Sequence, residues 1–552
     1  MKILLLGLNA RYTHTNLAIR RLKAAAGDLA EIKLLECSIN MDAEEILQKI
    51  ENADAVGFSC YIWNASLTKA LLPILKEKGM RLFIGGPEAA FSPEEYLKTC
   101  ECVFYGEGEN AFPVYLRHLL GEKALCEVPS IYYMEGNGIK KTKPAEPVDM
   151  DMFSESYALS DGETNHHRVV YYESSRGCPF RCAYCLSGAE KGLRFRSAKK
   201  TIEDMQLYAK MGVKHIKFVD RTFNADRERA KVIWRAVAAM DCESEFHFEI
   251  AADLLDEESV EIINSAPKKR IRLEIGVQST NEKTLQAIDR PCDMAKIARM
   301  TKLLSKGNAT VHLDLIAGLP YEDRNSFKKS FDETFAFGGS ELQLGFLKLL
   351  RGSTLYAKAE AFGIVCSKDA PYEVIRTSWV TEEDIEEMKK VEYALGRLYN
   401  SGLFRQTTRL MAKHFHSCYE ALLAFDAFAG DLHKLGEKAM AEALYAFGKA
   451  ENIPFMRDIL RYDMIKKEKR GYLPDVLEDG AAPEKKKYYA ENPDIPGLKK
   501  GKRAWHYSRL EKFGLDVRLF AETGEILGKE HYLFFDYIND DIFEVKNMLQ
   551  YM

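Results

Sequence analysis

The sequence lacks long apolar runs, an excess of basic charge and a secretory start. No uninterrupted apolar run approaches the ~20 residues needed to cross a bilayer, so we expect no membrane-spanning helix. The formal net charge of −5 argues against a protein that coats nucleic acid by bulk charge. The apolar start MKILLLGLNA has no cleavage site and leads into a helical pattern, which indicates a buried strand in a cytoplasmic protein.

Cysteine is sparse for a chain of 552 residues, since there are twelve and most are scattered. A scattered cysteine in a cytoplasmic protein is usually a small buried hydrophobic residue. Three depart from this pattern: Cys178, Cys182 and Cys185 lie within the stretch ESSRGCPFRCAYCLSG with the spacing C-x3-C-x2-C. This stretch is therefore the first candidate for chemistry.

Residues 1 to about 120 alternate short apolar runs with amphipathic helical patterns. The runs KILLLGL, IKLLEC, AVGFSCY, MRLFIGG and CVFYGEG predict buried parallel strands, because each is continuous rather than alternating. The segments between them carry apolar residues at i, i+3 and i+4, which predicts helices on both faces of a sheet. We therefore predict a flavodoxin-like, doubly wound α/β domain over residues 1–126.

Ligands of doubly wound sheets bind beyond the carboxyl ends of the strands. The sequence places Ser59 and the pair Gly85-Gly86 at such ends, and His14 and Trp63 in the turns after two strands. Paired glycines let the backbone approach a bulky ligand closely, although they also make a simple tight turn. Small and polar residues at several strand ends suit a large, flat cofactor.

Residues 127–167 are expected to form a linker with a hairpin around Gly136-Asn137-Gly138. Six strand candidates with helical patterns between them follow over residues 168–362. Such units at spacings of roughly thirty residues predict a partial (β/α)6 barrel, with its chemistry at the carboxyl ends of the strands. Those ends carry the polar residues Asp220, Glu249, Asp253, Glu274, Gln278, Asp314, Lys348 and Arg351.

Three kinds of site could use the cysteines. A structural zinc site needs a fourth Cys or His to close its tetrahedron. A thioredoxin-like redox pair would use Cys182 and Cys185 and leave Cys178 unexplained. An iron–sulfur cluster held by three thiolates would leave one iron open for a substrate or cofactor, and an open metal position is typical of a catalytic site.

The cysteine stretch, with Tyr184 before its last cysteine and its place after the first barrel strand, resembles that of the radical S-adenosylmethionine superfamily. The resemblance implies that Cys178, Cys182 and Cys185 hold a [4Fe-4S] cluster whose open iron binds S-adenosylmethionine. The next strand end, FVDRTFN, is similar to that of members with an N-terminal cobalamin-binding domain. On this resemblance S-adenosylmethionine is bound by Asp220 at its methionyl part, Glu249 near its ribose, Glu274 and Gln278.

The resemblance extends to the first domain. Cobalamin-binding domains are flavodoxin-like, and Ser59 and Gly85-Gly86 match the strand end and the turn around the nucleotide tail of the cofactor. The usual axial-ligand motif is D-x-H-x-x-G, whereas YTHTNL keeps His14 but lacks the Asp and the Gly, so cobalt ligation by His14 is open. Trp63 could cover one face of the corrin or pack in the core.

Residues 363–552 have a different pattern. TEEDIEEMKKVEYALGRLYNSG predicts a long amphipathic helix from Thr381, and further helical patterns follow. VRLFAETGEILGKEHYLFFDYI predicts paired strands around a Thr-Gly-Glu turn. We therefore expect a mainly helical C-terminal extension ending in strands, which resembles the uncharacterised extension behind this type of protein and names no substrate.

The resemblance implies an enzyme that generates a 5′-deoxyadenosyl radical and methylates an unactivated carbon through methylcobalamin. An electron donor such as flavodoxin or ferredoxin would be its partner. Ring rearrangement or other non-methylating radical chemistry is the alternative with the same cofactors.

A hypothesis of a different class is an RNA- or protein-binding module with a structural metal site. Basic residues with interleaved aromatic ones can bind RNA, but the overall charge argues against nucleic acid as a partner. The residues in question are Lys485–Lys487, Tyr488, Tyr489, Lys499, Lys500, Lys502, Arg503, Trp505 and Tyr507.

Overall fold

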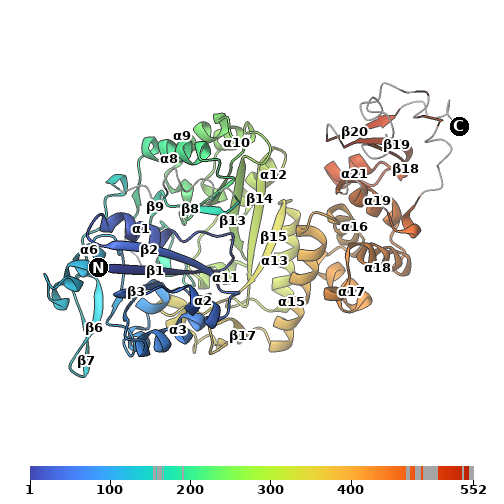
Figure 1. Ribbon diagram of the computed structural model, residues 1–552. Coiled ribbons are helices and arrows are strands. Elements are labelled where there is room, and N and C mark those ends of the chain that lie inside the picture. Colours follow the sequence, from blue (N-terminus) through green and yellow to red (C-terminus); the bar gives the residue numbers. More distant parts are fainter. Residues whose placement is uncertain are drawn as a thin grey trace. The chain divides into compact units, whose positions relative to one another are not determined.

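The structure, a computed structural model, describes residues 1–152, 157, 165, 167–188, 192–467, 473–478, 487–488, 491, 508–537 and 540–545 (Figure 1). The chain forms two compact units. The first comprises Met1–Phe327, Phe337–Ser340 and Leu344–Glu382, and the second comprises Lys328–Ala336, Glu341–Gln343 and Glu383–Met552. Within the described part of the chain, no helix has both the length and the apolar character needed to cross a membrane.

The first sheet begins with five parallel strands. They are β1 (Lys2–Asn9), β2 (Glu31–Ser38), β3 (Ala55–Ser59), β4 (Arg81–Gly85) and β5 (Cys102–Phe104). Their order in space, 2-1-3-4-5, is that of flavodoxin-like folds. The prediction of a flavodoxin-like domain is therefore confirmed.

Helices cover both faces of this sheet because β1 is apolar on both sides. Leu4, Leu6 and Leu8 pack in a core with α2 (Ala43–Lys49) and α3 (Ala65–Glu77). Ile3 and Leu5 pack in a second core with α1 (Leu17–Ala26) and α6 (Phe112–Leu119). Alternate residues of a strand point to opposite faces, so one continuous apolar run supplies both cores.

The expected hairpin is present and extends the first sheet. Strand β6 (Ile131–Glu135) pairs antiparallel with β5, and β7 (Gly138–Lys141) pairs antiparallel with β6. Gly136 in the turn has φ = 59°, a left-handed conformation that favours glycine.

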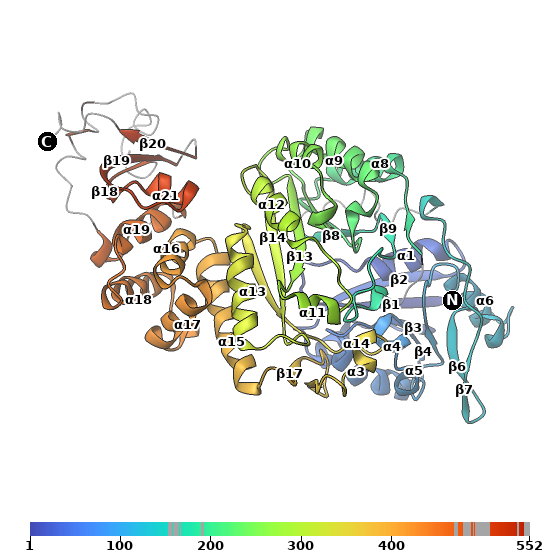
Figure 2. The same cartoon turned by 180° about the vertical axis from the view of Figure 1, so that it is seen from behind.

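The second sheet contains the six expected strands of the partial barrel (Figure 2). They are β8 (Val169–Tyr172), β11 (His215–Phe218), β12 (Glu245–Ile250), β13 (Ile271–Gln278), β14 (Thr310–Ala317) and β15 (Glu341–Phe346). Their order, β15-β14-β13-β12-β11-β8, leaves β8 and β15 at the two edges. Crossover helices between them include α8 (Ala198–Lys210), α9 (Arg227–Ala239), α10 (Glu257–Asn264) and α12 (Met294–Leu304).

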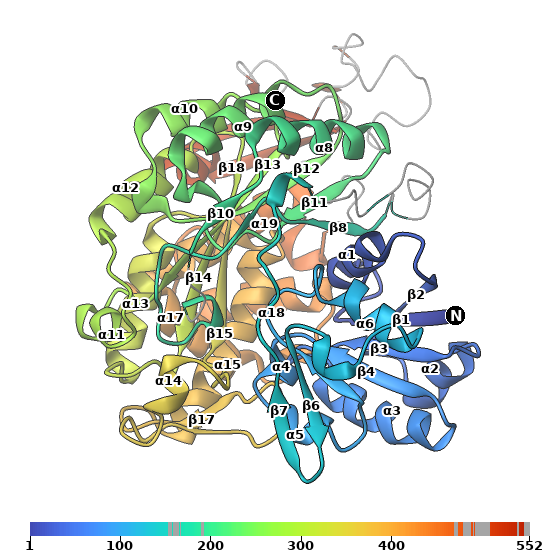
Figure 3. The same cartoon turned by 90° about the vertical axis from the view of Figure 1, so that its left-hand side faces the viewer.

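The first domain covers the edge strand β8. The Val169 N–H donates to the Thr13 carbonyl (2.7 Å), and the Thr15 N–H donates to the Val169 carbonyl (3.2 Å). Residues 13–15 therefore lie along β8 like a short added strand, and Figure 3 shows β8 beside α1. This pairing satisfies backbone groups that an open sheet edge would otherwise expose.

The second unit is mainly helical and ends in strands, as expected. Its helices include α15 (Glu382–Leu395), α16 (Arg405–Phe415), α17 (Cys418–Ala429), α18 (Glu437–Ala450) and α19 (Met456–Lys467). An antiparallel sheet follows, formed by β18 (Ser508–Leu515), β19 (Gly528–Asp536) and β20 (Asp541–Val545).

The prediction of strands for the segment VRLFAETGEILGKEHYLFFDYI is wrong in its first half. Val517–Thr523 form helix α21, whose N-cap Asp516 accepts a hydrogen bond from the Leu519 N–H. Gly524 ends this helix in the left-handed conformation. Strand β19 instead pairs with β18. The capping Asp and the terminating Gly were the signals of a helix.

Most of the basic and aromatic cluster lies outside the described residues, which between positions 485 and 508 are only Lys487, Tyr488, Glu491 and Ser508. Tyr488 is buried in a small core with Leu510 and Phe534. Its ring is therefore occupied by packing within the second unit.

A buried carboxylate joins two helices of the second unit. Asp463 of α19 accepts hydrogen bonds from the Thr407 N–H (2.7 Å), the Thr407 hydroxyl (2.9 Å) and the Gln406 N–H (3.2 Å), at the start of α16. Burial raises the pKa of Asp463 to about 7, although the hydrogen bonds from Thr407 and Gln406 act in the opposite direction.

We predict that Asp463 makes the second unit less stable as the pH rises from about 4 to about 7. The unfolded carboxyl has an ordinary pKa of 3.8, so in this window the native state binds more protons than the unfolded state and loses stability with rising pH. Asp463→Asn should remove this dependence and change the pH 5 to pH 8 difference in unfolding free energy by about 2 kcal/mol or more. Urea unfolding at both pH values measures it. Asp475→Asn, at an exposed position, is the control and should keep the wild-type dependence.

Candidate functional site

The three cysteines share one loop beyond the carboxyl end of β8. Cys182 is buried, and Cys178 and Cys185 are partly buried. The loop backbone is anchored at Ala183, whose N–H donates to the Ile288 carbonyl and whose carbonyl accepts from the Leu355 N–H (both 2.7 Å). Among the described residues no three potential ligand side chains form a preassembled metal site, so the assignment of these cysteines as cluster ligands stays a prediction.

Two polar side chains contact the thiols. The Cys178 Sγ lies 3.4 Å from the Thr222 hydroxyl, and the Arg290 Nη1 donates to the Cys182 Sγ at 3.4 Å. The second Nη of Arg290 donates to the Gly276 carbonyl of β13. Hydrogen bonds to sulfur tune iron–sulfur clusters, so Arg290 is a functional candidate that the sequence analysis missed. Its position at the end of the β13 pattern EIGVQSTNEKTLQAIDR was the available signal.

The inner face of the partial barrel is polar because its strands alternate. In β12, β13 and β14 every second residue is fully buried under the outer helices, and the intervening residues are only partly buried. The strand register puts Glu249 opposite Glu274, and Glu274 opposite His312. The polar inner residues are Lys217, His247, Glu249, Glu274, Gln278, His312 and Asp314.

The two expected carboxylates of this face have opposite electrostatic character. Burial and the neighbouring Glu274 raise the pKa of Glu249. Burial also acts on Glu274, but His247 Nε2 (3.0 Å) and Lys217 Nζ (2.9 Å) hold its pKa well below the ordinary value. Adjacent carboxylates whose pKa values are pushed apart take different roles. Glu274 is therefore a fixed anion, and Glu249 is the carboxyl that can carry a proton.

Gln278 ends β13 in an unusual conformation. Its φ is 70°, and the register slips between Gly276 and Gln278. A Cβ on Gly276 would lie 2.3 Å from the Gln278 Nε2, so a side chain there would displace the Gln278 amide. The Gln278 Oε1 is buried and has no hydrogen-bond partner among the described residues. A buried acceptor of this kind at a strand end is suited to a donor on a bound ligand.

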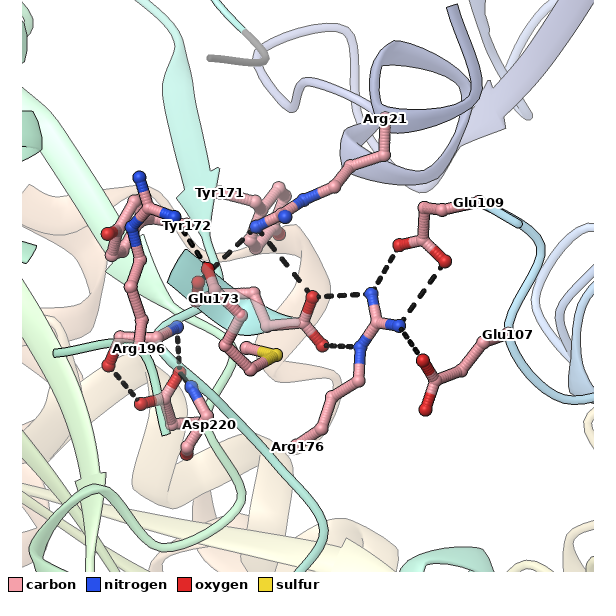
Figure 4. Close-up of polar contacts among 12 residues, drawn as sticks. Arg21, Glu107, Glu109, Tyr171, Tyr172, Glu173, Arg176, Arg196 and Asp220 are labelled. Carbon is pink, nitrogen blue, oxygen red and sulfur yellow. Dashed lines mark hydrogen bonds and ion pairs between the residues drawn. The ribbon is translucent and has the colours of Figure 1, made fainter. Parts of the chain in front are cut away.

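Asp220 lies apart from this inner face. It is 0% exposed, and it accepts hydrogen bonds from the Ser174 N–H (2.7 Å), the Ser174 hydroxyl and the Ser175 N–H (3.1 Å) (Figure 4). Burial raises its pKa, although these hydrogen bonds oppose the change. The structure therefore places Asp220 against the start of the cysteine loop, where its oxygens are occupied by the protein.

In the first domain, Ser59 and the glycine pair lie at the carboxyl edge of the sheet. Asn16 Nδ2 donates to the Ser59 hydroxyl at 3.1 Å. The Cys60 N–H donates to the Gly85 carbonyl at 2.8 Å. Gly86 has φ = 104°, and a Cβ there would lie 2.3 Å from the Cys60 carbonyl oxygen. The tight-turn interpretation thus accounts for Gly86 without a ligand.

His14 and Trp63 differ in their surroundings. The His14 Nδ1 lies 3.0 Å from the Tyr171 hydroxyl on β8, and burial, with positive charges nearby, lowers the pKa of His14. Trp63 is 47% exposed and stacks on Tyr61 with ring centroids 4.4 Å apart. The core-packing alternative for Trp63 is therefore wrong, and its outer face is open to a flat ligand.

We predict that Gly86 tolerates no side chain. Gly86→Ala should lower the free energy of unfolding by about 3 kcal/mol or more, because it combines a glycine-only conformation with a backbone clash. Gly121→Ala is the matched control. Gly121 also has a positive φ (80°) but open space around its Cβ position, so the expected loss is about 1–2 kcal/mol. Denaturant unfolding of the full chain measures both, and equal losses would contradict the clash at Gly86.

Three family models match the chain. "B12 binding domain" matches residues 3–116, "Radical SAM superfamily" matches residues 172–334, and "Protein of unknown function (DUF4080)" matches residues 360–535. The first two domains imply cobalamin, S-adenosylmethionine and a [4Fe-4S] cluster as cofactors. The buried, unpartnered Oε1 of Gln278 fits S-adenosylmethionine, and the three cysteines fit the [4Fe-4S] cluster.

The relatives are distant. The chain is 25% identical over 321 residues to the 2-(S-pantetheinyl)-carbapenam-3-carboxylate methyltransferase of Streptantibioticus cattleyicolor, which is 54% of this chain and 47% of that protein. It is 23% identical over 370 residues to the cobalamin-dependent radical SAM methyltransferase TokK of Streptomyces tokunonensis, which is 62% and 53% of the two chains. The chain thus spans about half the length of these relatives.

A solved structure shares the fold. The cobalamin-dependent S-adenosylmethionine radical enzyme OxsB, with aqua-cobalamin and S-adenosylmethionine bound, superposes with a TM-score of 0.59 at 15% identity. The match covers 89% of this chain and 75% of that chain. The shared architecture concerns the fold; with its B12-binding domain and its radical SAM domain, the chain belongs among the cobalamin-binding radical S-adenosylmethionine proteins.

Proposed function

We propose that the protein is a cobalamin-dependent radical S-adenosylmethionine methyltransferase that methylates an unactivated carbon. The observation that carries the proposal is the position of the cysteine loop. The loop starts at the boundary between the two domains, since Arg176, two residues before Cys178, forms ion pairs with Glu107 and Glu109 of the first domain. Cofactors held by the two domains would then be neighbours.

The difficult chemistry belongs to the cofactors. When bound, S-adenosylmethionine at the cluster supplies a 5′-deoxyadenosyl radical, and methylcobalamin supplies the methyl group. The protein's part is to bind and orient these groups and to exclude water. Cys178, Cys182 and Cys185 would hold three irons, and the fourth would stay open to S-adenosylmethionine.

We assign the inner face of the barrel to S-adenosylmethionine. The unpartnered Gln278 Oε1 would accept a hydrogen bond from it, and Glu249, whose raised pKa favours a protonated carboxyl, would contact a ribose hydroxyl. Glu274 is neutralised by Lys217, lies within hydrogen-bond distance of His247, and shapes the wall between them. Asp220 acts on the cofactor only through Ser174 and Ser175, so it is a positioning residue.

We assign the carboxyl edge of the first sheet to cobalamin. Ser59, Gly85 and Gly86 would surround its nucleotide tail, and the exposed face of Trp63 would lie against the corrin. His14 is anchored to the edge of the barrel through Tyr171 and through its backbone, so we do not assign it to cobalt. We propose a cytoplasmic location and a flavodoxin- or ferredoxin-like reductant.

Two alternatives bear on this assignment. Ring rearrangement uses the same cofactors, and the names of the matched relatives, which are methyltransferases, favour methyl transfer. A structural zinc site would need a fourth ligand, and Cys292 is the candidate, because it shares the neighbourhood of Cys182: burial raises the pKa of its thiol, and the nearby Cys182 acts in the same direction. Replacing Cys292 therefore separates the two kinds of site.

We predict that Cys178→Ala, Cys182→Ala and Cys185→Ala each lose the cluster. After anaerobic reconstitution with iron and sulfide, wild type should hold about one four-iron cluster per chain. Under reduction it should cleave S-adenosylmethionine to 5′-deoxyadenosine, which chromatography measures, and each variant should cleave at least ~100-fold less.

The controls are Cys292→Ala and Cys126→Ala, the second at an exposed position. Both should retain iron and cleavage. If zinc fills the wild-type site and Cys292→Ala releases it, the site is structural and the proposed function is wrong.

A second prediction concerns cobalamin. The full chain incubated with hydroxocobalamin should retain about one corrinoid per chain after gel filtration, as its visible spectrum reports. Trp63→Ala should weaken this binding by about 10-fold, since a stacked aromatic face is lost, and Trp379→Ala serves as a control outside the first sheet. A chain that binds no corrinoid would be a radical protein without methyl transfer.

A further inference from the structure

We propose that Arg176 is a positioning residue through which the first domain sets the conformation of the cysteine loop, so that corrinoid binding and the cluster site are energetically coupled. The identity of the two ligands rests on the proposed function. The contact between the domains does not, and it can be tested without any cofactor.

Arg176 uses its whole guanidinium group (Figure 4). Its Nε and Nη2 donate to the two carboxylate oxygens of Glu173, both at 2.9 Å. Its Nη1 lies 3.0 Å from a Glu107 oxygen and 3.2 Å from a Glu109 oxygen. Its Nη2 also donates to the second Glu109 oxygen. Two-pronged contacts of this kind fix direction as well as distance.

The charges around Arg176 balance. Arg21 Nη2 lies 3.8 Å from a Glu173 oxygen and donates to the Glu173 carbonyl at 3.3 Å. Arg194 pairs with Glu107. We call these residues the Arg176 cluster: Arg21, Glu107, Glu109, Glu173, Arg176 and Arg194.

The Arg176 cluster therefore contains three cations and three anions, and its members are mostly shielded from solvent. The side chains of Arg176 and Glu109 are 16% and 11% exposed. Burying one unpaired charge is costly, whereas a paired and hydrogen-bonded set is tolerated. The conformation shown is thus the one in which all six charges have partners. A shift of Arg176 would break the ion pair of Glu109, whereas Glu107 would keep Arg194.

The position of the Arg176 cluster links two functional edges. Glu107 and Glu109 follow β5, at the carboxyl edge where doubly wound sheets bind ligands. Arg176 lies in β9 (Ser175–Arg176), which pairs with β10 (Arg194–Phe195). Only Gly177 separates it from Cys178 in the chain. The binding of a ligand to the first domain and of an iron–sulfur cluster to the cysteine loop would both depend on the six side chains of the Arg176 cluster.

The backbone between Arg176 and Cys178 has little conformational freedom. Gly177 has φ = 91°, and a Cβ there would lie 2.0 Å from the Gly192 carbonyl oxygen. On the preceding side, Ser174 and Ser175 are held by Asp220 of the barrel. The backbone from residue 174 to residue 177 is therefore fixed from both sides, and a displacement of Arg176 must pass into the loop.

The coupling follows from linkage. A corrinoid that orders Glu107 and Glu109 lowers the free-energy cost of fixing Arg176 in its observed conformation. An iron–sulfur cluster that orders the cysteine loop lowers the same cost. If one ligand changes the affinity for the other, the reverse effect is equal by thermodynamic necessity. The competing explanation is an ordinary ion pair that only joins two domains, which predicts no specific effect on the loop.

The first test uses the cofactor-free full chain and backbone hydrogen exchange. Arg176→Lys keeps the charge but loses the planar fork, and Glu109→Gln keeps the shape but loses the charge. In both variants the amides of residues 177–186 should exchange about 10-fold faster than in wild type, with the strands of both sheets unchanged. Arg299→Lys, in the exposed pair with Glu257 (2.6 Å), is the matched control and should exchange like wild type.

If the amides of residues 177–186 exchange at the wild-type rate in both Arg176→Lys and Glu109→Gln, Arg176 does not position the cysteine loop. If Arg176→Lys fails to fold, Glu109→Gln carries the test alone, because Arg176 then keeps Glu107 and Glu173 as partners.

The second test uses the reconstituted protein. In wild type, hydroxocobalamin should raise the affinity of the reduced cluster for S-adenosylmethionine about 5-fold or more, measured by titrating the electron paramagnetic resonance signal. Glu109→Gln should still load iron and bind corrinoid but lose at least half of this effect, and Arg299→Lys should keep it.

The outcomes separate the two proposals. A wild type that neither loads iron nor binds corrinoid contradicts the proposed function and leaves the exchange result standing. If hydroxocobalamin raises the affinity for S-adenosylmethionine equally in wild type and in Glu109→Gln, the coupling through Arg176 is wrong.

Discussion

The open edge of the barrel sheet at β8 is the constraint on which the rest of the first unit depends. A parallel sheet that does not close must cover its edge strand, and here residues 13–15 of the first domain do so through two main-chain hydrogen bonds. The ion pair between Arg168 and Glu36 (2.6 Å) stabilises the same contact between the first domain and β8. This pairing lies at the same domain boundary as the ion pairs between Arg176 and the two glutamates that follow β5, Glu107 and Glu109. The His14 side chain is part of this contact between the two domains, since its ring lies within hydrogen-bond distance of Tyr171 on β8.

Charge in this unit is handled by local compensation. Lys217 neutralises Glu274 inside the barrel, and the Arg176 cluster balances three cations with three anions at the domain boundary. Each set is partly shielded from solvent, where an uncompensated charge would be expensive. Polar residues can therefore occupy both regions without loss of stability. The Gln278 Oε1 is a buried polar atom without a partner among the described residues, and it is the one to which we assign a ligand.

Much of the fold follows from periodicity alone. Continuous apolar runs predicted the five parallel strands of a doubly wound sheet, and strand candidates with helical patterns between them predicted the six strands of the barrel. The spacing of the cysteines predicted a shared loop. Periodicity identifies the face on which a residue lies but not its partner. Asp220 was expected to contact a ligand, yet it contacts Ser174, 46 positions away.

The same limit applies to the residues that the sequence analysis missed. Arg176 and Glu109 are separated by 67 positions, and Arg290 reaches a thiol 108 positions earlier in the chain. Such pairs depend on how two sheets meet, which no local pattern specifies. The error at α21 was of another kind, because the capping Asp516 and the terminating Gly524 were present but the alternation of VRLFAET was given more weight.

The balance of the Arg176 cluster has an evolutionary consequence. Cofactor domains are often treated as modules that can be recombined between proteins. Here two carboxylates of one domain neutralise an arginine of the other, next to the loop that carries the cysteines. A transplanted first domain without acids at positions 107 and 109 would leave the largely buried Arg176 guanidinium with Glu173 alone of its three carboxylate partners. An exchange of the first domain would therefore preserve this balance only if the new domain also carried acids at positions 107 and 109.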